Sequence, residues 1–249
     1  MHASASPADH PPVRLSPGLD RAAIAARLRA AGRVHIDGIL VPEAAARLHR
    51  CLKEEVAWNT IFNDGDEKIH ALHATQVAAM TPQQQAALGE HILSGARKGF
   101  QFVFHNYPVW DLYQKKLGPD LYVNRVLEFL NGEEFLDFVR EVSGIPEIGM
   151  ADCQATLYKP HHFLTRHDDL GRPDQKRRMA YVLNMTPAWR PEWGGMLEFL
   201  DEAGNVTEGF IPSFNALNMF VVPTPHLVSY VTPFASGGRY SMTGWLREK

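Results

Sequence analysis

Near the end of the sequence, one run of residues reads Gly238-Arg239-Tyr240-Ser241-Met242-Thr243-Gly244-Trp245-Leu246. Its residues alternate in character with a period of two, the period at which the side chains of a β-strand share a face. Arg239 and Ser241 fall on one face, and mostly apolar residues fall on the other. Taken alone, the run fits an edge strand whose polar face meets water, with Arg239 in a surface ion pair. Inside an apolar barrel, the same two side chains would need an anionic partner such as a dicarboxylate.

Short alternating runs rich in β-forming residues fill the chain from about residue 148 onward. Proline, glycine and asparagine separate these runs, as they do between strands of antiparallel sheets. Several short strands at this spacing predict a β-sandwich or a jelly roll. We expect strands at residues 152–158, 179–184, 196–200, 206–211, 217–222, 227–231 and 240–246.

The preceding part of the chain reads mostly as helix. Start and stop signals predict helices at residues 19–31, 42–56, 81–95, 121–130 and 133–142, with strands at 34–37 and 100–104. Residues 1–17 are small, polar and proline-rich, and we expect a disordered tail there. The predicted fold class is therefore α+β, with residues 18–249 as a single domain. In this domain, residues 18–147 supply helical support and residues 148–249 form a jelly-roll core.

The composition is that of an ordinary globular protein, with 45% hydrophobic and 21% charged residues among 249. The formal net charge of -3 gives no electrostatic support for binding nucleic acid or an anionic membrane. No run of eighteen apolar residues occurs, so no membrane span is expected. Cys51 and Cys153 are the only cysteines, too few for a disulfide framework, and this favours a reducing, cytoplasmic location.

The triplet His167-Asp168-Asp169 is a candidate metal-binding element. If the segment is extended, His167 and Asp169 point to the same side and Asp168 points to the other. A third ligand must come from elsewhere, and His226 opens the penultimate predicted strand. Two imidazoles and one carboxylate on one side of a metal leave other positions open, which is typical of non-haem iron(II) oxygenases.

Each of these residues also has a simpler interpretation. A His-x-Asp pair often occurs by chance, and a single histidine is more often a hydrogen-bonded structural residue than a ligand. His161 and His162 are rival ligands by type, although their position after Pro160 favours a loop. Tyr158 fits a half-buried strand tyrosine as well as a hydrogen-bond donor to a cosubstrate. The joint occurrence of the histidines, the carboxylate and Arg239 favours the metal centre.

The stretch from about residue 151 to 247 resembles the double-stranded β-helix core of the 2-oxoglutarate- and iron(II)-dependent dioxygenases. It looks most like the prolyl-hydroxylase branch, including the group that modifies ribosomal and translation proteins. The segments that carry the resemblance are His167-x-Asp169, Arg178-Met179-Ala180-Tyr181-Val182-Leu183-Asn184, Trp193-Gly194-Gly195-Met196-Leu197, Pro212-Ser213-Phe214-Asn215-Ala216-Leu217, Pro225-His226 and Arg239-Tyr240-Ser241 running to Trp245.

This resemblance implies a set of roles and cofactors. His167, Asp169 and His226 would hold Fe(II), and Arg239 with Ser241 would bind the distal carboxylate of 2-oxoglutarate, with Tyr158 contributing a hydrogen bond. O2 would be the second cosubstrate and ascorbate an accessory reductant. The substrate would be a protein or peptide that contains proline. No nucleic-acid or membrane partner is expected.

The sequence also departs from the resembled branch. A tyrosine that some prolyl hydroxylases use for the cosubstrate falls at Val182, and no counterpart of the second domain of eukaryotic ribosomal hydroxylases is found. A hydroxylase of a free amino acid or other small metabolite is therefore an alternative. A non-catalytic jelly-roll protein that binds metal is an alternative of another class. Trp245 stands where nucleic-acid demethylases carry a second arginine, which disfavours that activity.

Overall fold

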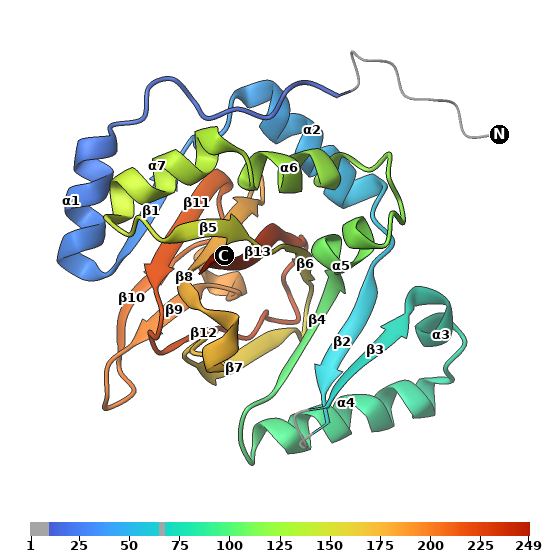
Figure 1. Ribbon diagram of the computed structural model, residues 1–249. Helices are drawn as coiled ribbons and strands as arrows, with labels where there is room; N and C mark the ends of the chain where they lie inside the picture. Colours follow the sequence, from blue (N-terminus) through green and yellow to red (C-terminus); the bar gives the residue numbers. More distant parts are fainter. Residues whose placement is uncertain (1–9, 65–67) are drawn as a thin grey trace.

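The computed structural model describes residues 10–64 and 68–249 (Figure 1). Its helices are α1 (Arg21–Ala31), α2 (Pro42–Glu54), α3 (Ala74–Ala78), α4 (Pro82–Ala96), α5 (Val109–Gln114), α6 (Tyr122–Leu130) and α7 (Glu133–Ser143). Its strands are β1 (Arg33–Asp37), β2 (Asn59–Asn63), β3 (Ile69–His73), β4 (Phe102–Tyr107), β5 (Ile148–Ala151), β6 (Gln154–Tyr158), β7 (Phe163–His167), β8 (Arg177–Met185), β9 (Leu197–Leu200), β10 (Val206–Phe210), β11 (Phe214–Val221), β12 (His226–Val228) and β13 (Arg239–Glu248).

Within the described residues, all of these strands belong to one antiparallel sheet that curls into a nearly closed barrel. The strand order is β1-β11-β8-β13-β6-β4-β7-β12-β9-β10, with β2 and β3 continuing from β4 and β5 pairing with β13. Strands distant in sequence thus become neighbours, as expected for a jelly roll. The predicted α+β fold with a double-stranded β-helix core is confirmed.

Successive side chains of the central strand β8 point to opposite faces of the sheet and pack in two different hydrophobic clusters. Tyr181 and Leu183 pack in the core shared with α1, α2, α6 and α7, whereas Ala180 and Val182 pack against the residues of β9 and β10. One face of the sheet around β8 is therefore covered by helices, and its other face packs against β9 and β10 on the opposite side of the barrel. Figure 1 shows α1, α6 and α7 lying along the outside of these strands. The candidate functional site lies in the interior of the barrel.

The part of the chain predicted as helical support also contributes strands to the barrel. The expected strands at residues 34–37 and 100–104 correspond to β1 and β4, but β2 and β3 were not predicted. Together with α3 and α4, these two strands form a lobe beside the barrel (Figure 1). β2 is held by backbone pairing with β4, a long-range partner that the pattern of its own residues does not reveal.

The predicted disordered tail is wrong for the residues that the structure describes. Leu15 is buried and forms a β-bridge with Leu40, and the Ser16 N–H donates to the Ile39 carbonyl at 2.8 Å. The Tyr122 hydroxyl donates to the Pro11 carbonyl at 2.7 Å. Residues 10–17 are thus ordered by contacts with distant elements, and residues 1–9 lie outside the described part of the chain.

In the described ranges, 10–64 and 68–249, no helix combines the length and apolar character needed to cross a bilayer.

Two neighbouring histidines, the half-buried His105 and the buried His162, have pKa values to which no acid of the described residues contributes. The rings of His105, on β4, and His162, in the turn after β6, meet edge to face at 4.6 Å. Burial lowers the pKa of His105 to about 4, with a further contribution from the charge of Lys159. Burial also lowers the pKa of His162 to about 3, helped by His105. Both imidazoles are therefore neutral in the folded protein near neutral pH.

These two histidines should make the protein less stable in acid. Between about pH 6.5 and pH 4 the unfolded chain takes up protons on them that the folded chain does not, so stability falls as pH falls. Each contributes up to about 1.4 kcal/mol per pH unit. Urea unfolding across this range should show a shallower pH dependence for His105→Gln than for the wild type. The exposed His73→Gln variant is the control, and an unchanged slope in His105→Gln would contradict the account.

Candidate metal centre and cosubstrate pocket

The pairing of β7 with β12 brings two histidines together. His226 is the register partner of His167, and their ring centroids are 4.1 Å apart. Asp169 follows two residues after β7 ends, with one carboxylate oxygen 3.5 Å from His167 Nε2 and the other 3.4 Å from His226 Nε2. One ligand atom from each residue lies within 4.8 Å of the other two. The three predicted ligands thus form one cluster.

Backbone carbonyls fix both imidazoles in the state that a metal requires. Nδ1 of His167 lies 3.0 Å from the Thr165 carbonyl, and Nδ1 of His226 lies 2.8 Å from the Thr224 carbonyl. Since a carbonyl oxygen only accepts, each Nδ1 carries the proton and each Nε2 has a free lone pair. Such outer contacts orient the ligands of metal sites.

The carboxylate reaches the cluster in a different way from the predicted one. The strand stops at His167, and Asp169 has a left-handed backbone with φ of 61°. Asp168 is exposed and its carboxylate accepts from the Leu170 N–H at 3.0 Å. Asp169 and not Asp168 faces the histidines, as predicted, but a turn rather than strand alternation places it there.

The protonation states suit metal binding. Burial alone would raise the pKa of Asp169, but the hydrogen bond with His226 and the nearby charges of His167 and Arg177 bring it below its usual value. Burial and the neighbouring His226 lower the pKa of His167. A carboxylate and a neutral imidazole are the forms that act as ligands. In the described part of the chain, no fourth His, Cys, Asp or Glu joins the group. An open three-ligand set fits a catalytic centre better than a structural one.

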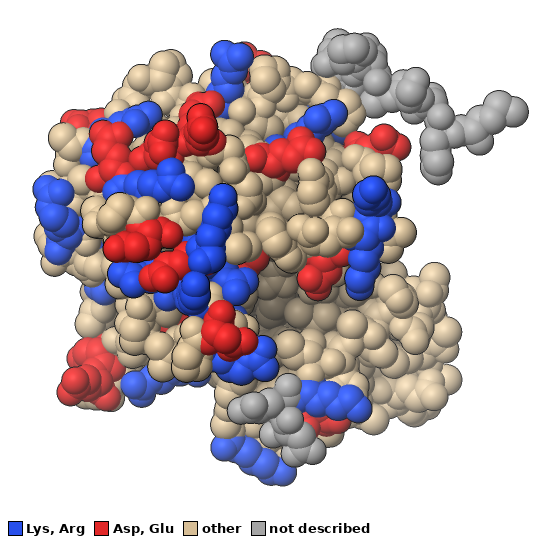
Figure 2. Space-filling view, viewed as in Figure 1, with Lys and Arg blue, Asp and Glu red and all other residues tan. Residues whose placement is uncertain are grey.

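The three ligands line a cavity of about 630 Å³ that opens to the surface. Figure 2 shows the surface hollowed between the main body and the lobe that contains α3 and α4. Its walls are largely apolar and include Phe102, Phe104 and Val228, while Arg239 lies among its lining residues. The cavity thus combines a metal-binding group, an apolar wall and one buried cation.

Arg239 is a buried cation without an acidic partner in the described residues. It is 2% exposed, its Nε atom has no hydrogen-bond partner, and its guanidinium lies 4.8 Å from the centre of the Tyr158 ring. Burial lowers the pKa of Arg239, and the contact with Tyr158 acts in the opposite direction. A buried guanidinium facing a cavity requires an anion, and a carboxylate matches its paired donors. The residues therefore fit 2-oxoglutarate bound with its distal carboxylate at Arg239.

The other two predicted cosubstrate residues take different positions. Tyr158 lines the cavity, stacks on Phe104 at 4.9 Å, and has a phenol pKa raised by burial. Ser241 is fully buried on the same side of β13 as Arg239, but its hydroxyl lies 2.8 Å from that of Thr156. Thr156, and not Ser241, is among the residues that line the cavity. Ser241 is therefore placed to orient Thr156.

Several lining residues were missed by the sequence reasoning. Asn106 donates to Gln154 at 3.3 Å, and Arg177 reaches the loop that carries Asp169. No local sequence pattern marks Asn106 and Gln154 as cavity residues, because their side chains meet only through the pairing of β4 with β6. The rival ligands His161 and His162 lie in the turn after β6, away from the cluster, as predicted.

Comparison with known proteins agrees with this geometry. The protein-family model for the 2OG-Fe(II) oxygenase superfamily matches residues 153–247 of the sequence. This range contains His167, Asp169, His226 and Arg239. The β-rich part of the chain is thus similar to this superfamily. The matched superfamily uses Fe(II), 2-oxoglutarate and O2, and the three-ligand cluster with Arg239 agrees with that chemistry.

Similar proteins include prolyl hydroxylases. The chain is 30% identical over 147 residues to mouse (Mus musculus) prolyl 3-hydroxylase OGFOD1, a match that covers 54% of this chain and 26% of that protein. The structure of a Pseudomonas putida prolyl-4-hydroxylase aligns with a TM-score of 0.58 and 18% identity, over 92% of this chain and 99% of the other. The structure of a Trichoplax adhaerens prolyl hydroxylase in complex with a hypoxia inducible factor peptide fragment aligns with a TM-score of 0.54 and 15% identity. The alignment covers 92% of this chain and 89% of the other. These structural likenesses establish the fold.

Removing one ligand should abolish metal-dependent turnover. Asp169→Ala and His226→Ala each leave two ligands, so we expect neither variant to retain iron after anaerobic dialysis or to form succinate from 2-oxoglutarate. His161→Ala is the matched control, because this histidine lies outside the cluster, and it should retain both properties. Iron-dependent turnover near the wild-type rate in either ligand variant would contradict the assignment.

Replacing Arg239 should act on the cosubstrate. Arg239→Ala removes the buried cation that faces the cavity, and we expect the KM for 2-oxoglutarate to rise about 100-fold, as for loss of one partner of a buried charge pair. Arg178→Ala serves as control, since Arg178 pairs with Glu248 at 2.9 Å outside the cavity. Steady-state succinate formation at varied 2-oxoglutarate measures the effect. A KM equal to that of the control would exclude the proposed contact.

Proposed function

We propose that this protein is a 2-oxoglutarate- and Fe(II)-dependent dioxygenase that hydroxylates a prolyl residue of a protein or peptide. The observation that carries the reaction class is the buried Arg239, which has no acidic partner among the described residues and lies in the same cavity as the His167, Asp169 and His226 cluster. A bound metal alone would not require that cation. The similarity to OGFOD1 and to solved prolyl hydroxylases supports proline as the target.

The chain's own residues have distinct tasks in this reaction. When bound, Fe(II) supplies the O2 activation that couples oxidative decarboxylation of 2-oxoglutarate to succinate and CO2 with hydroxylation of a C–H bond. His167, Asp169 and His226 would hold the metal, and the carbonyl contacts of the two rings keep their Nε2 atoms directed at it. Arg239 orients the cosubstrate through its distal carboxylate. The apolar walls limit access of water to the reacting atoms.

The mouth of the cavity supports a polypeptide substrate. Ile69, Phe100 and Leu170 line it and are 63%, 46% and 57% exposed. Large apolar side chains gathered at an open cleft are typical of surfaces that bind another molecule. A free amino acid would be enclosed by a smaller, closed pocket, whereas the hollow in Figure 2 is open to the surface. The cleft therefore favours a protein loop that carries the proline.

A cytoplasmic location and a stimulating effect of ascorbate belong to the same proposal. Cys51 and Cys153 are both buried and free, which suits a reducing compartment. Ascorbate follows from the reaction class, since it can return oxidised iron to Fe(II).

The test is succinate formation from 2-oxoglutarate by anaerobically iron-loaded protein, with ascorbate, in the presence of proline-containing peptides from ribosomal-protein and elongation-factor loops. We expect one peptide to stimulate turnover and to gain one oxygen atom on its proline, and the Asp169→Ala variant to do neither. The same peptides with alanine in place of proline are the substrate control.

Two other outcomes would redirect the proposal. Iron-dependent turnover that only free amino acids or other metabolites stimulate would replace the prolyl substrate and keep the dioxygenase. Absence of turnover by protein that binds metal would favour the non-catalytic interpretation.

A further inference from the structure

The loop that carries Asp169 has an unusual backbone. Asp169 and Gly171 are both left-handed, with φ of 61° and 65°. Glycine adopts this conformation freely, but an aspartate adopts it much less often than the right-handed one. The metal's carboxylate ligand also lies beyond the end of β7 and so has no strand ladder to hold it. Something outside the loop must fix its position.

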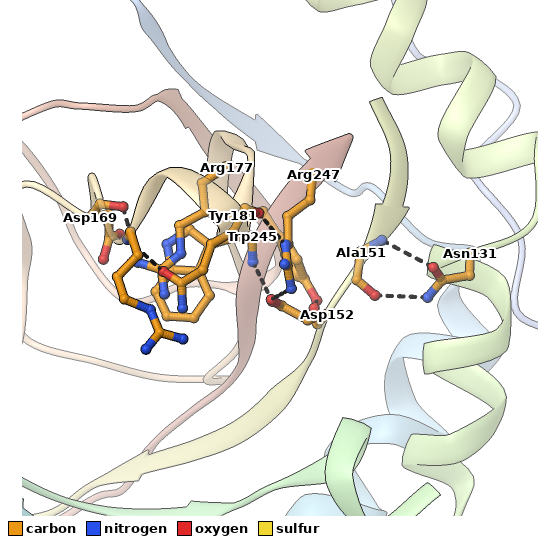
Figure 3. Close-up of polar contacts among 10 residues, drawn as sticks. Asn131, Ala151, Asp152, Asp169, Arg177, Tyr181, Trp245 and Arg247 are labelled. Carbon is orange, nitrogen blue, oxygen red and sulfur yellow. Dashed lines mark hydrogen bonds and ion pairs between the residues drawn. The ribbon is translucent and has the colours of Figure 1, made fainter. Parts of the chain in front are cut away.

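Arg177, the first residue of β8, makes that contact. Its Nη1 donates to the main-chain carbonyl of Asp169 at 3.1 Å. Figure 3 shows its side chain between Asp169 and Trp245. A Cβ added to Gly171 would lie only 2.8 Å from the same Nη1. The absence of a side chain at Gly171 therefore allows the loop to pass close to the guanidinium.

The guanidinium in turn rests on a fixed surface. Its central carbon lies 3.5 Å from the centre of the Trp245 ring, a close cation–π stack. The Trp245 backbone N–H donates to Asp152 Oδ1 at 2.7 Å, and Arg247 contacts the other oxygen of this carboxylate at 3.4 Å (Figure 3). The chain of contacts from Asp152 through Trp245 and Arg177 to Asp169 therefore joins the barrel wall to the ligand loop.

The site of this hydrogen bond on Asp169 matters for the metal. Arg177 donates to the carbonyl of Asp169, and in the described residues no ion pair joins it to the Asp169 carboxylate. Both carboxylate oxygens remain directed at the two imidazoles. An arginine bound to the carboxylate would compete with a metal ion, whereas one bound to the carbonyl positions the ligand and leaves its charge available.

We propose that Arg177 is a positioning residue that holds Asp169 in its left-handed conformation and thereby sets the metal affinity of the site. This inference rests on the metal centre of the proposed function and not on the identity of the substrate. Arginine suits the task because its planar group stacks on Trp245 and donates a hydrogen bond at the same time. A lysine ammonium keeps the charge but cannot form that planar stack.

The adjacent Arg178 provides a matched control. It has the same chemistry and lies on the same strand, but it points away from the cavity and pairs with Glu248 at 2.9 Å. Arg178→Met therefore removes an equal charge and an equal side chain without touching the ligand loop.

The test compares Mn(II) affinity, measured by isothermal titration calorimetry without cosubstrate or substrate, with the thermal midpoint of the metal-free protein. We expect Arg177→Met to weaken Mn(II) binding about 10- to 100-fold, the effect typical of lost contacts to a ligand. Arg178→Met should bind as the wild type does, and Arg177→Lys should lie between wild type and Arg177→Met. The thermal midpoint should change little, because Arg177 acts on a surface loop.

Wild-type Mn(II) affinity in folded Arg177→Met would overturn the proposal. If that variant does not fold, Arg177→Lys decides, and wild-type affinity there would overturn it equally. A lower thermal midpoint with unchanged affinity would assign Arg177 a purely structural role and also overturn it. If the wild-type protein itself binds no Mn(II), the metal centre and with it the proposed function fail, a result distinct from a defect confined to the variants.

Discussion

The antiparallel pairing of β7 with β12 is the contact on which the site depends. It sets His167 opposite His226, although the two residues are far apart in sequence. The carbonyls of Thr165 and Thr224, each two residues before its histidine, then fix both rings. Any shift of this register by one residue would turn one imidazole away, because side chains alternate along a strand. The remaining pairs of the barrel keep these two short strands in register.

A buried guanidinium that has no acidic partner in the described part of the chain is the second constraint. Arg239 emerges from β13, whose opposite side packs Met242 and Leu246 into the core beneath the helices. The strand thus stabilises the fold with one face and presents a guanidinium to the cavity with the other. Such a cation is unfavourable until an anion binds, so its burial favours a carboxylate-bearing ligand in this pocket.

The sequence predicted the parts of this arrangement that follow from local periodicity. Period-two alternation placed Arg239 and Ser241 on the same side of one strand. It does not show which of the two side chains reaches the cavity, and the Ser241 hydroxyl contacts Thr156 instead. Asp169 and not Asp168 lies beside the histidines, but a left-handed turn, whose carbonyl accepts from Arg177, places it there instead of strand alternation. Long-range contacts were not predictable: β2 is ordered by β4, and residues 10–17 by contacts such as that of Leu15 with Leu40.

We propose that one cavity binds both the metal and the cosubstrate in the positions described. A crystal structure grown anaerobically with Mn(II) and 2-oxoglutarate tests it most directly, since anomalous scattering locates the metal. We expect Mn(II) on Nε2 of His167 and His226 and on the Asp169 carboxylate, with the distal carboxylate of 2-oxoglutarate on Arg239. Metal bound at other residues, or a cosubstrate whose distal carboxylate lies away from Arg239, would contradict it.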